Sequence, residues 1–117
     1  MSILGNEKPG MFNILQVTSR AAADVASLIA APGANKAIVI TGVYYHIETA
    51  EATKAVTIKD GAGTPVVCYV IPLTTAGATG FIPMNWKATV NDLIQLDTDG
   101  TTGKWSLIVY YYISPMN

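Results

Sequence analysis

Short runs of hydrophobic residues, many of them alternating with polar ones, follow one another along the chain. Residues 55–59 alternate cleanly, with Val56 and Ile58 on one side and polar residues between them. A period of two is the spacing of side chains on one face of a β-strand, so these runs predict strands. Turn residues separate them, as in a β-sandwich. The predicted strands cover residues 11–18, 25–30, 36–48, 55–59, 66–71, 81–84, 92–97 and 104–113.

The longest run, residues 36–48, is apolar on both faces. Simple alternation places Tyr44 on the same face as Ile38 and Ile40. The opposite face then holds Val39, Val43, Tyr45 and Ile47. A strand that is apolar on both sides is expected to be covered on both sides. One face is predicted to lie in the core, and the other against a neighbouring element or another subunit.

The last run, residues 104–113, combines a core-like face with a face rich in tyrosine. The core-like face holds Trp105, Leu107, Val109, Tyr111 and Ile113. The other face carries Ile108, Tyr110 and Tyr112. Aromatic rings with a polar end are enriched at protein interfaces. We therefore predict a subunit interface formed by Ile108, Tyr110, Tyr112, Tyr44 and His46.

Turn residues and prolines indicate how some strands are connected. Asp60 and Gly61 open a D-G-A-G turn that predicts a hairpin between residues 55–59 and 66–71. Residues 74–80 are small and polar and predict a loop. Pro83 confines residues 81–84 to an edge or a strand end, because proline cannot donate a hydrogen bond to a sheet.

The size and composition of the chain predict a single domain that associates with itself. The chain has 117 residues, which is enough for one hydrophobic core. Only 13% of the residues are charged, against about a quarter in an average soluble domain. Large neutral or apolar surfaces are usually covered by a partner. We expect an antiparallel β-sandwich over residues 11–117 that forms a homo-oligomer, with residues 1–10 as an N-terminal arm.

Several classes of partner do not fit the sequence. The net charge is −1 and neither sign clusters, so no nucleic-acid-binding surface is predicted. Apolar runs end well short of the roughly 20 residues that span a bilayer, so no membrane span is predicted. The single cysteine, Cys68, cannot form an internal disulfide and is expected to be a buried, inert thiol. We expect no cofactor.

No group of residues points to catalysis or to metal binding. His46 is the only histidine and no G-x-S-x-G motif accompanies it, so we expect no catalytic triad and no enzyme. Asp97, Asp99 and Gly100 resemble the start of a calcium loop. Ile108 stands where such a loop needs a glutamate, so an acidic hairpin turn is predicted instead.

Two aromatic residues leave a carbohydrate-binding alternative open. Trp86 and Tyr69, if exposed, would offer rings on which a sugar could stack. A module of a phage fibre or tail that binds a carbohydrate or a receptor is therefore the alternative function. The competing interpretation of Trp86 is a loop residue anchored over the edge of the core, because tryptophan is highly buried on average.

The sequence A-A-P-G-A-N-K-A-I-V-I at residues 30–40 resembles that of small bacteriophage virion proteins, in which such a turn leads into a long strand. Further matching features are the small-residue loop at 74–80, the aromatic and proline segment at 81–86, and the aromatic-rich strand at 105–113. The resemblance covers residues 25–113.

This resemblance implies a jelly-roll sandwich and a structural function. Proteins of this group look like capsid decoration (cement) or head and tail accessory proteins, commonly trimers. The expected partner is the major capsid protein of a phage shell, and the expected location is the capsid surface of the virion. Residues 1–10 are the candidate capsid-contacting arm.

Overall fold

Every regular element of the described chain is a β-strand, as the sequence predicts. The computed structural model describes residues 12–18, 24–101 and 103–115. The expected arm, residues 1–10, lies outside these ranges. No helix of the described part is long and apolar enough to cross a membrane. The strands are β1 Phe12–Thr18, β2 Val25–Ile29, β3 Lys36–Ile47, β4 Ala55–Asp60, β5 Val66–Pro72, β6 Thr79–Lys87, β7 Ile94–Asp97 and β8 Trp105–Pro115.

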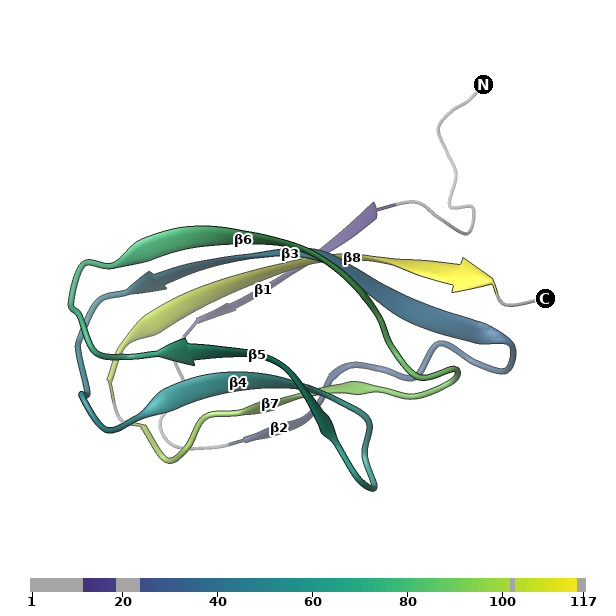
Figure 1. Ribbon diagram of the computed structural model, residues 1–117, viewed down its shortest axis with the longest axis horizontal. Coiled ribbons are helices and arrows are strands. Elements are labelled where there is room, and N and C mark those ends of the chain that lie inside the picture. The colour runs from purple at the N-terminus through teal and green to yellow at the C-terminus, as the bar shows by residue number, and fades with distance from the viewer. Residues whose placement is uncertain (1–11, 19–23, 102, 116–117) are drawn as a thin grey trace.

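The strands form two four-stranded sheets that pack face to face (Figure 1). The first sheet has the order β1-β8-β3-β6 and the second the order β2-β7-β4-β5. All neighbouring strands are antiparallel. Among the described strands, only β4 and β5 follow each other within one sheet, which is the hairpin that the D-G-A-G turn predicts. Every other connection passes between the sheets, so the fold is an eight-stranded, jelly-roll-like sandwich.

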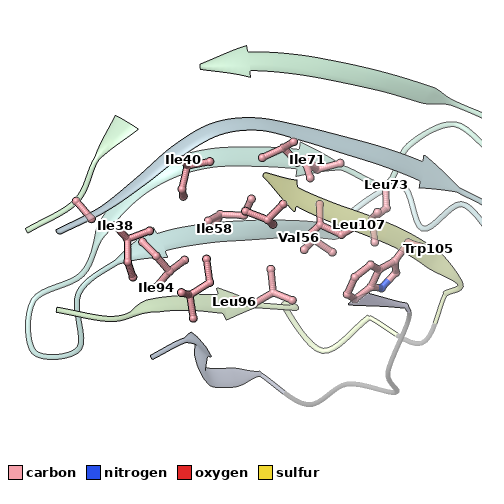
Figure 2. Packing of buried hydrophobic residues seen from close by; sticks show 14 of the residues in the cluster. Ile38, Ile40, Val56, Ile58, Ile71, Leu73, Ile94, Leu96, Trp105 and Leu107 are labelled. Atoms are coloured by element: carbon pink, nitrogen blue, oxygen red, sulfur yellow. The ribbon is translucent and has the colours of Figure 1, made fainter. Parts of the chain in front are cut away.

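The core lies between the inner faces of the two sheets (Figure 2). In β4 the side chains alternate: Val56 and Ile58 point inward and are buried, whereas Thr57 and Lys59 are only half-buried. Full burial of one such aliphatic side chain contributes about 1.5–3 kcal/mol. The fully buried aliphatic residues include Ile38, Ile40, Val43, Val56, Ile58, Leu73, Ile94, Leu96, Leu107 and Val109.

A β-bulge in β3 makes one part of the sequence prediction wrong. The register of β3 with both of its neighbours shifts between Ile40 and Gly42. Between these positions β3 has one residue more than β8, namely Thr41. This extra residue reverses the alternation, so Ile38 and Ile40 point into the same core as Val43. Tyr44, which simple alternation groups with Ile38 and Ile40, lies on the opposite face. The hydroxyl of Thr41, the residue within the bulge, donates to the carbonyl of Tyr110 at 3.2 Å.

Three connections differ from their sequence-based interpretation. β6 begins at Thr79, inside the predicted loop, and runs on to Lys87 as an edge strand, which agrees with Pro83. The segment after Asp97 is not a hairpin turn, because β7 and β8 belong to different sheets. Asp60 is the last residue of β4 and only 6% exposed, not a solvated turn residue.

Candidate self-association surface

The five residues predicted to form a subunit interface lie together on the outer face of the first sheet. They are Tyr44 and His46 on β3 and Ile108, Tyr110 and Tyr112 on β8. On β8 they alternate with Leu107 and Val109, which are buried in the core. Tyr44 is paired directly with Ile108 across the two strands. The five residues predicted from the sequence therefore form one contiguous face. Simple alternation would have placed Tyr44 on the same face as Ile38 and Ile40, and it is the bulge in β3 that brings Tyr44 to the outer face.

Phe81 belongs to the same face and was missed by the sequence analysis. It lies on β6, paired with Tyr44, and at 54% exposed it is the most exposed large hydrophobic side chain described. Its alternation with Ile82 along β6 could have revealed it, but this segment had been interpreted as a short apolar run. We call Tyr44, His46, Phe81, Ile108, Tyr110 and Tyr112 the outer aromatic surface.

Gly42 allows two rings of the outer aromatic surface to meet across β3. The rings of Phe81 and Tyr110 form an edge-to-face pair with centroids 5.8 Å apart and an interplanar angle of 76°. Gly42 is paired with Tyr110 on one side and with Pro83 on the other. A Cβ at Gly42 would lie 2.7 Å from Cε1 of Phe81 and closer still to Cζ. The absence of a side chain at this position therefore lets the Phe81 ring lie over β3.

The outer aromatic surface carries almost no charge. β3, β6 and β8 contain no carboxylate. Their two lysines, Lys36 and Lys87, are the first residue of β3 and the last residue of β6. The centre of the face is thus formed by aromatic and aliphatic side chains with tyrosine hydroxyls. This composition is typical of a protein contact, where charged residues are depleted and aromatic residues enriched.

The structure places Trp86 against the core and not on an open face. Trp86 lies on β6, packs against the core cluster, and donates its indole N–H to Asp60 Oδ2 at 3.3 Å. The same carboxylate accepts from the backbone N–H of Thr89 at 3.1 Å. Asp60 thereby ties β4 of one sheet to the end of β6 in the other. Trp86 is an anchor, as the competing interpretation holds, but in a strand and not in a loop.

Tyr69 and Cys68 lie in β5 and also pack against the core cluster. Tyr69 is therefore not a freely presented ring. The thiol of Cys68 is half-buried, and its burial, together with the negative charge of Asp60, raises its pKa to about 12. A thiol with so high a pKa carries very little thiolate at neutral pH and is a poor nucleophile. The expectation of an unreactive cysteine thus has a physical cause here.

Two carboxylates near the turns, those of Glu51 and Asp97, act as hydrogen-bond acceptors within the fold. Oε1 of Glu51 accepts from the hydroxyl of Thr101 and from the backbone N–H of Gly103, the latter at 2.8 Å. Asp97 forms an ion pair with Lys59 at 3.0 Å. Among the described residues, no group of His, Cys, Asp and Glu could hold a metal ion.

A small cavity lies in the core next to Trp105. It is lined by residues of β3, β4, β5 and β8, among them His46, Val56 and Leu107. Its volume of about 10 Å³ corresponds to a single water molecule at most. Small-molecule sites are far larger, on the order of 300–1,000 Å³. This cavity is therefore far too small to hold a small-molecule ligand.

Comparison with known proteins reveals a distant structural likeness. No protein family and no curated protein matches the sequence. Among solved structures, the chain is similar to one from Bacillus endospore appendages, described as a novel family of disulfide-linked pili. The two chains share 16% identity over 99% of this chain and 100% of that chain, with a TM-score of 0.44. A likeness this distant carries no functional conclusion.

Proposed function

We propose that this protein is a structural, self-associating protein of a bacteriophage virion. It is a capsid decoration protein that forms trimers, binds the major capsid protein and stabilises the head shell. The observation that carries this proposal is the outer aromatic surface, an uncharged face of aromatic and aliphatic side chains on a rigid sheet. The jelly-roll-like topology agrees with the resemblance of residues 25–113 to small phage virion proteins.

The sheet face that carries the outer aromatic surface approaches the size of a specific contact. With strands about 4.8 Å apart and a rise of about 3.3 Å per residue, strands with the lengths of β1, β8, β3 and β6 offer a face of about 600 Å². Stable protein interfaces bury about 800 Å² on each partner. Burial of Tyr44, 37% exposed, and Phe81, 54% exposed, would remove the largest apolar groups of this face from water.

The carbohydrate-binding alternative has weaker support in the geometry. A sugar stacks on the open face of an aromatic ring. Trp86 packs on the core with its N–H bound to Asp60, and Tyr69 also packs against the core. We therefore keep the structural proposal as the conclusion.

The solution mass of the protein, measured by light scattering at two concentrations, tests the proposal. The wild type should have the mass of a trimer or a multiple of it. Tyr44→Lys should lose the threefold contact, because it places a charge at the centre of an uncharged face. Val90→Lys is the matched control, since Val90 is 44% exposed and lies in the loop between β6 and β7. An unchanged mass for Tyr44→Lys would contradict the use of this face.

Co-sedimentation with phage shells tests the capsid part of the proposal. Purified shells that lack their decoration protein should retain the wild type in the pellet at a fixed ratio to the capsid protein. A wild-type protein that forms trimers yet stays in the supernatant would leave a self-associating protein without a capsid function.

A further inference from the structure

One side of the sandwich is built from strands without any charged residue. Residues 61–86 contain no Asp, Glu, Lys or Arg. This stretch includes all of β5 and all of β6 except its last residue, Lys87. Both are edge strands of their sheets, and they run along the same side of the two layers (Figure 1). The hydrogen bond between Trp86 and Asp60 links the sheets along this side.

Edge strands of soluble proteins are usually protected against pairing with another chain. Charged side chains, especially lysine, prolines, bulges and short length are the common devices. β6 has Pro83 at its centre, and β2 has only five residues and a shifted register. β5 has neither a charge nor a central proline, since Pro72 is its last residue. It does carry a bulge, because Cys68 is an extra residue between Val67 and Tyr69, which pair with Lys59 and Ile58 of β4. Beyond this bulge, Tyr69, Val70, Ile71 and Pro72 pair with β4 in regular register.

The solvent-exposed side chains of β5 are those of a strand that pairs with another strand. Val66, Val67 and Val70 are 53%, 48% and 43% exposed. Valine is among the residues most favoured within sheets and fits between neighbouring strands. Val67 and Val70 lie on the outer face of the second sheet, paired with Lys59 and Thr57 of β4. Exposed apolar side chains on an edge strand without charge favour pairing with another chain.

We propose that β5 pairs with β5 of a second copy of this chain, antiparallel and about a twofold axis. In such an isologous contact each strand meets an identical strand, so any charge near the axis would face its own copy. β5 and the turn before it carry none, which removes this repulsion. The two second sheets then join into one continuous sheet, and the exposed valines of both chains become cross-strand neighbours.

This contact is separate from the outer aromatic surface. β5 belongs to the second sheet, whereas Tyr44, Phe81 and Tyr110 lie on the first. The two contacts therefore share no residue. The β5 contact does not require the proposed capsid function, and either can be removed while the other is kept.

Val70→Lys tests the β5 contact, with Val90→Lys as a matched control. Val70 and Val90 are 43% and 44% exposed, so both substitutions place the same charge on an equally accessible residue. Only Val70 lies on the edge strand. The mass measured by light scattering should fall at least twofold for Val70→Lys and stay unchanged for Val90→Lys. Val67→Lys, at a second exposed position of β5, should repeat the result if Val70→Lys does not fold.

Amide hydrogen exchange of the wild type gives an independent readout. Peptides covering residues 66–72 should exchange slowly at high protein concentration and faster on dilution, because pairing protects the outer backbone amides. Concentration-independent exchange of this segment, with equal masses for the wild type and Val70→Lys, would overturn the proposal. If the outer aromatic surface forms no contact but β5 does, the wild type is instead a dimer, and Val70→Lys converts it to a monomer.

Discussion

Gly42 shows how one residue determines the shape of the outer aromatic surface. A Cβ at this position would collide with the ring of Phe81. Gly42→Ala should therefore displace the ring and break its edge-to-face contact with Tyr110. Because Phe81 is exposed and can swing away, we expect a loss of about 1 kcal/mol, the low end for overpacking. Urea denaturation of the monomeric Tyr44→Lys/Val70→Lys double variant, with and without Gly42→Ala, measures this change in the free energy of unfolding.

The same substitution at Gly63 provides the control. A Cβ there would meet nothing within 4 Å, so Gly63→Ala should be neutral or slightly stabilising. In a Phe81→Ala background, Gly42→Ala should also lose its cost, because the colliding ring is gone. A cost that persists in this background would mean that the backbone at Gly42, and not the ring, resists a side chain.

The ion pair between Lys59 and Asp97 joins two neighbouring elements, β4 and β7. The hydrogen bond from Lys59 and the backbone N–H of Asp99 hold the pKa of Asp97 below its usual value of 3.8. A carboxylate whose pKa is lower in the folded chain stabilises the fold above the unfolded value. This contribution is lost as the pH falls through the folded pKa. For a pair this exposed it amounts to less than about 1 kcal/mol.

Lys59→Gln should raise the pKa of Asp97 toward its usual value, as followed by NMR titration of the side-chain carboxyl. It should also lower the free energy of unfolding at neutral pH, and this difference from the wild type should vanish at pH values below the folded pKa. Lys104→Gln removes the same charge from an exposed residue outside the strands and should leave the Asp97 titration unchanged. A pKa of Asp97 that Lys59→Gln leaves unmoved would assign the shift to the Asp99 N–H instead.

For whole strands, the sequence predicts where each strand lies better than it predicts which way the side chains face. Alternation located β4, β7 and β8 because each packs one face on a core and so repeats with a period of two. It failed within β3, since the bulge near Thr41 depends on register with β6 and β8, which are distant in sequence. Asp60 was misassigned because its hydrogen-bond donors, Trp86 and Thr89, come from another part of the chain.

For the whole molecule, low charge predicts association but cannot say which surfaces associate. The sequence identified the tyrosine-rich face of β8, because that face is visible within one strand. It could not identify β5 as an edge, since strand order depends on pairings between segments far apart in the chain. Strand order therefore places residues 66–71 at an edge, where their backbone can pair with another strand.

Two contacts of different symmetry on one chain predict a defined series of masses. Tyr44→Lys should leave only the β5 contact and give dimers, and Val70→Lys should leave only the outer aromatic contact and give trimers. The double variant should be a monomer. The wild type should reach roughly six chains or more, because twofold and threefold contacts combine into a closed particle or continue into a lattice. Sedimentation velocity of the four proteins at one concentration tests this series, and a wild type no larger than the trimeric variant would exclude simultaneous use of both surfaces.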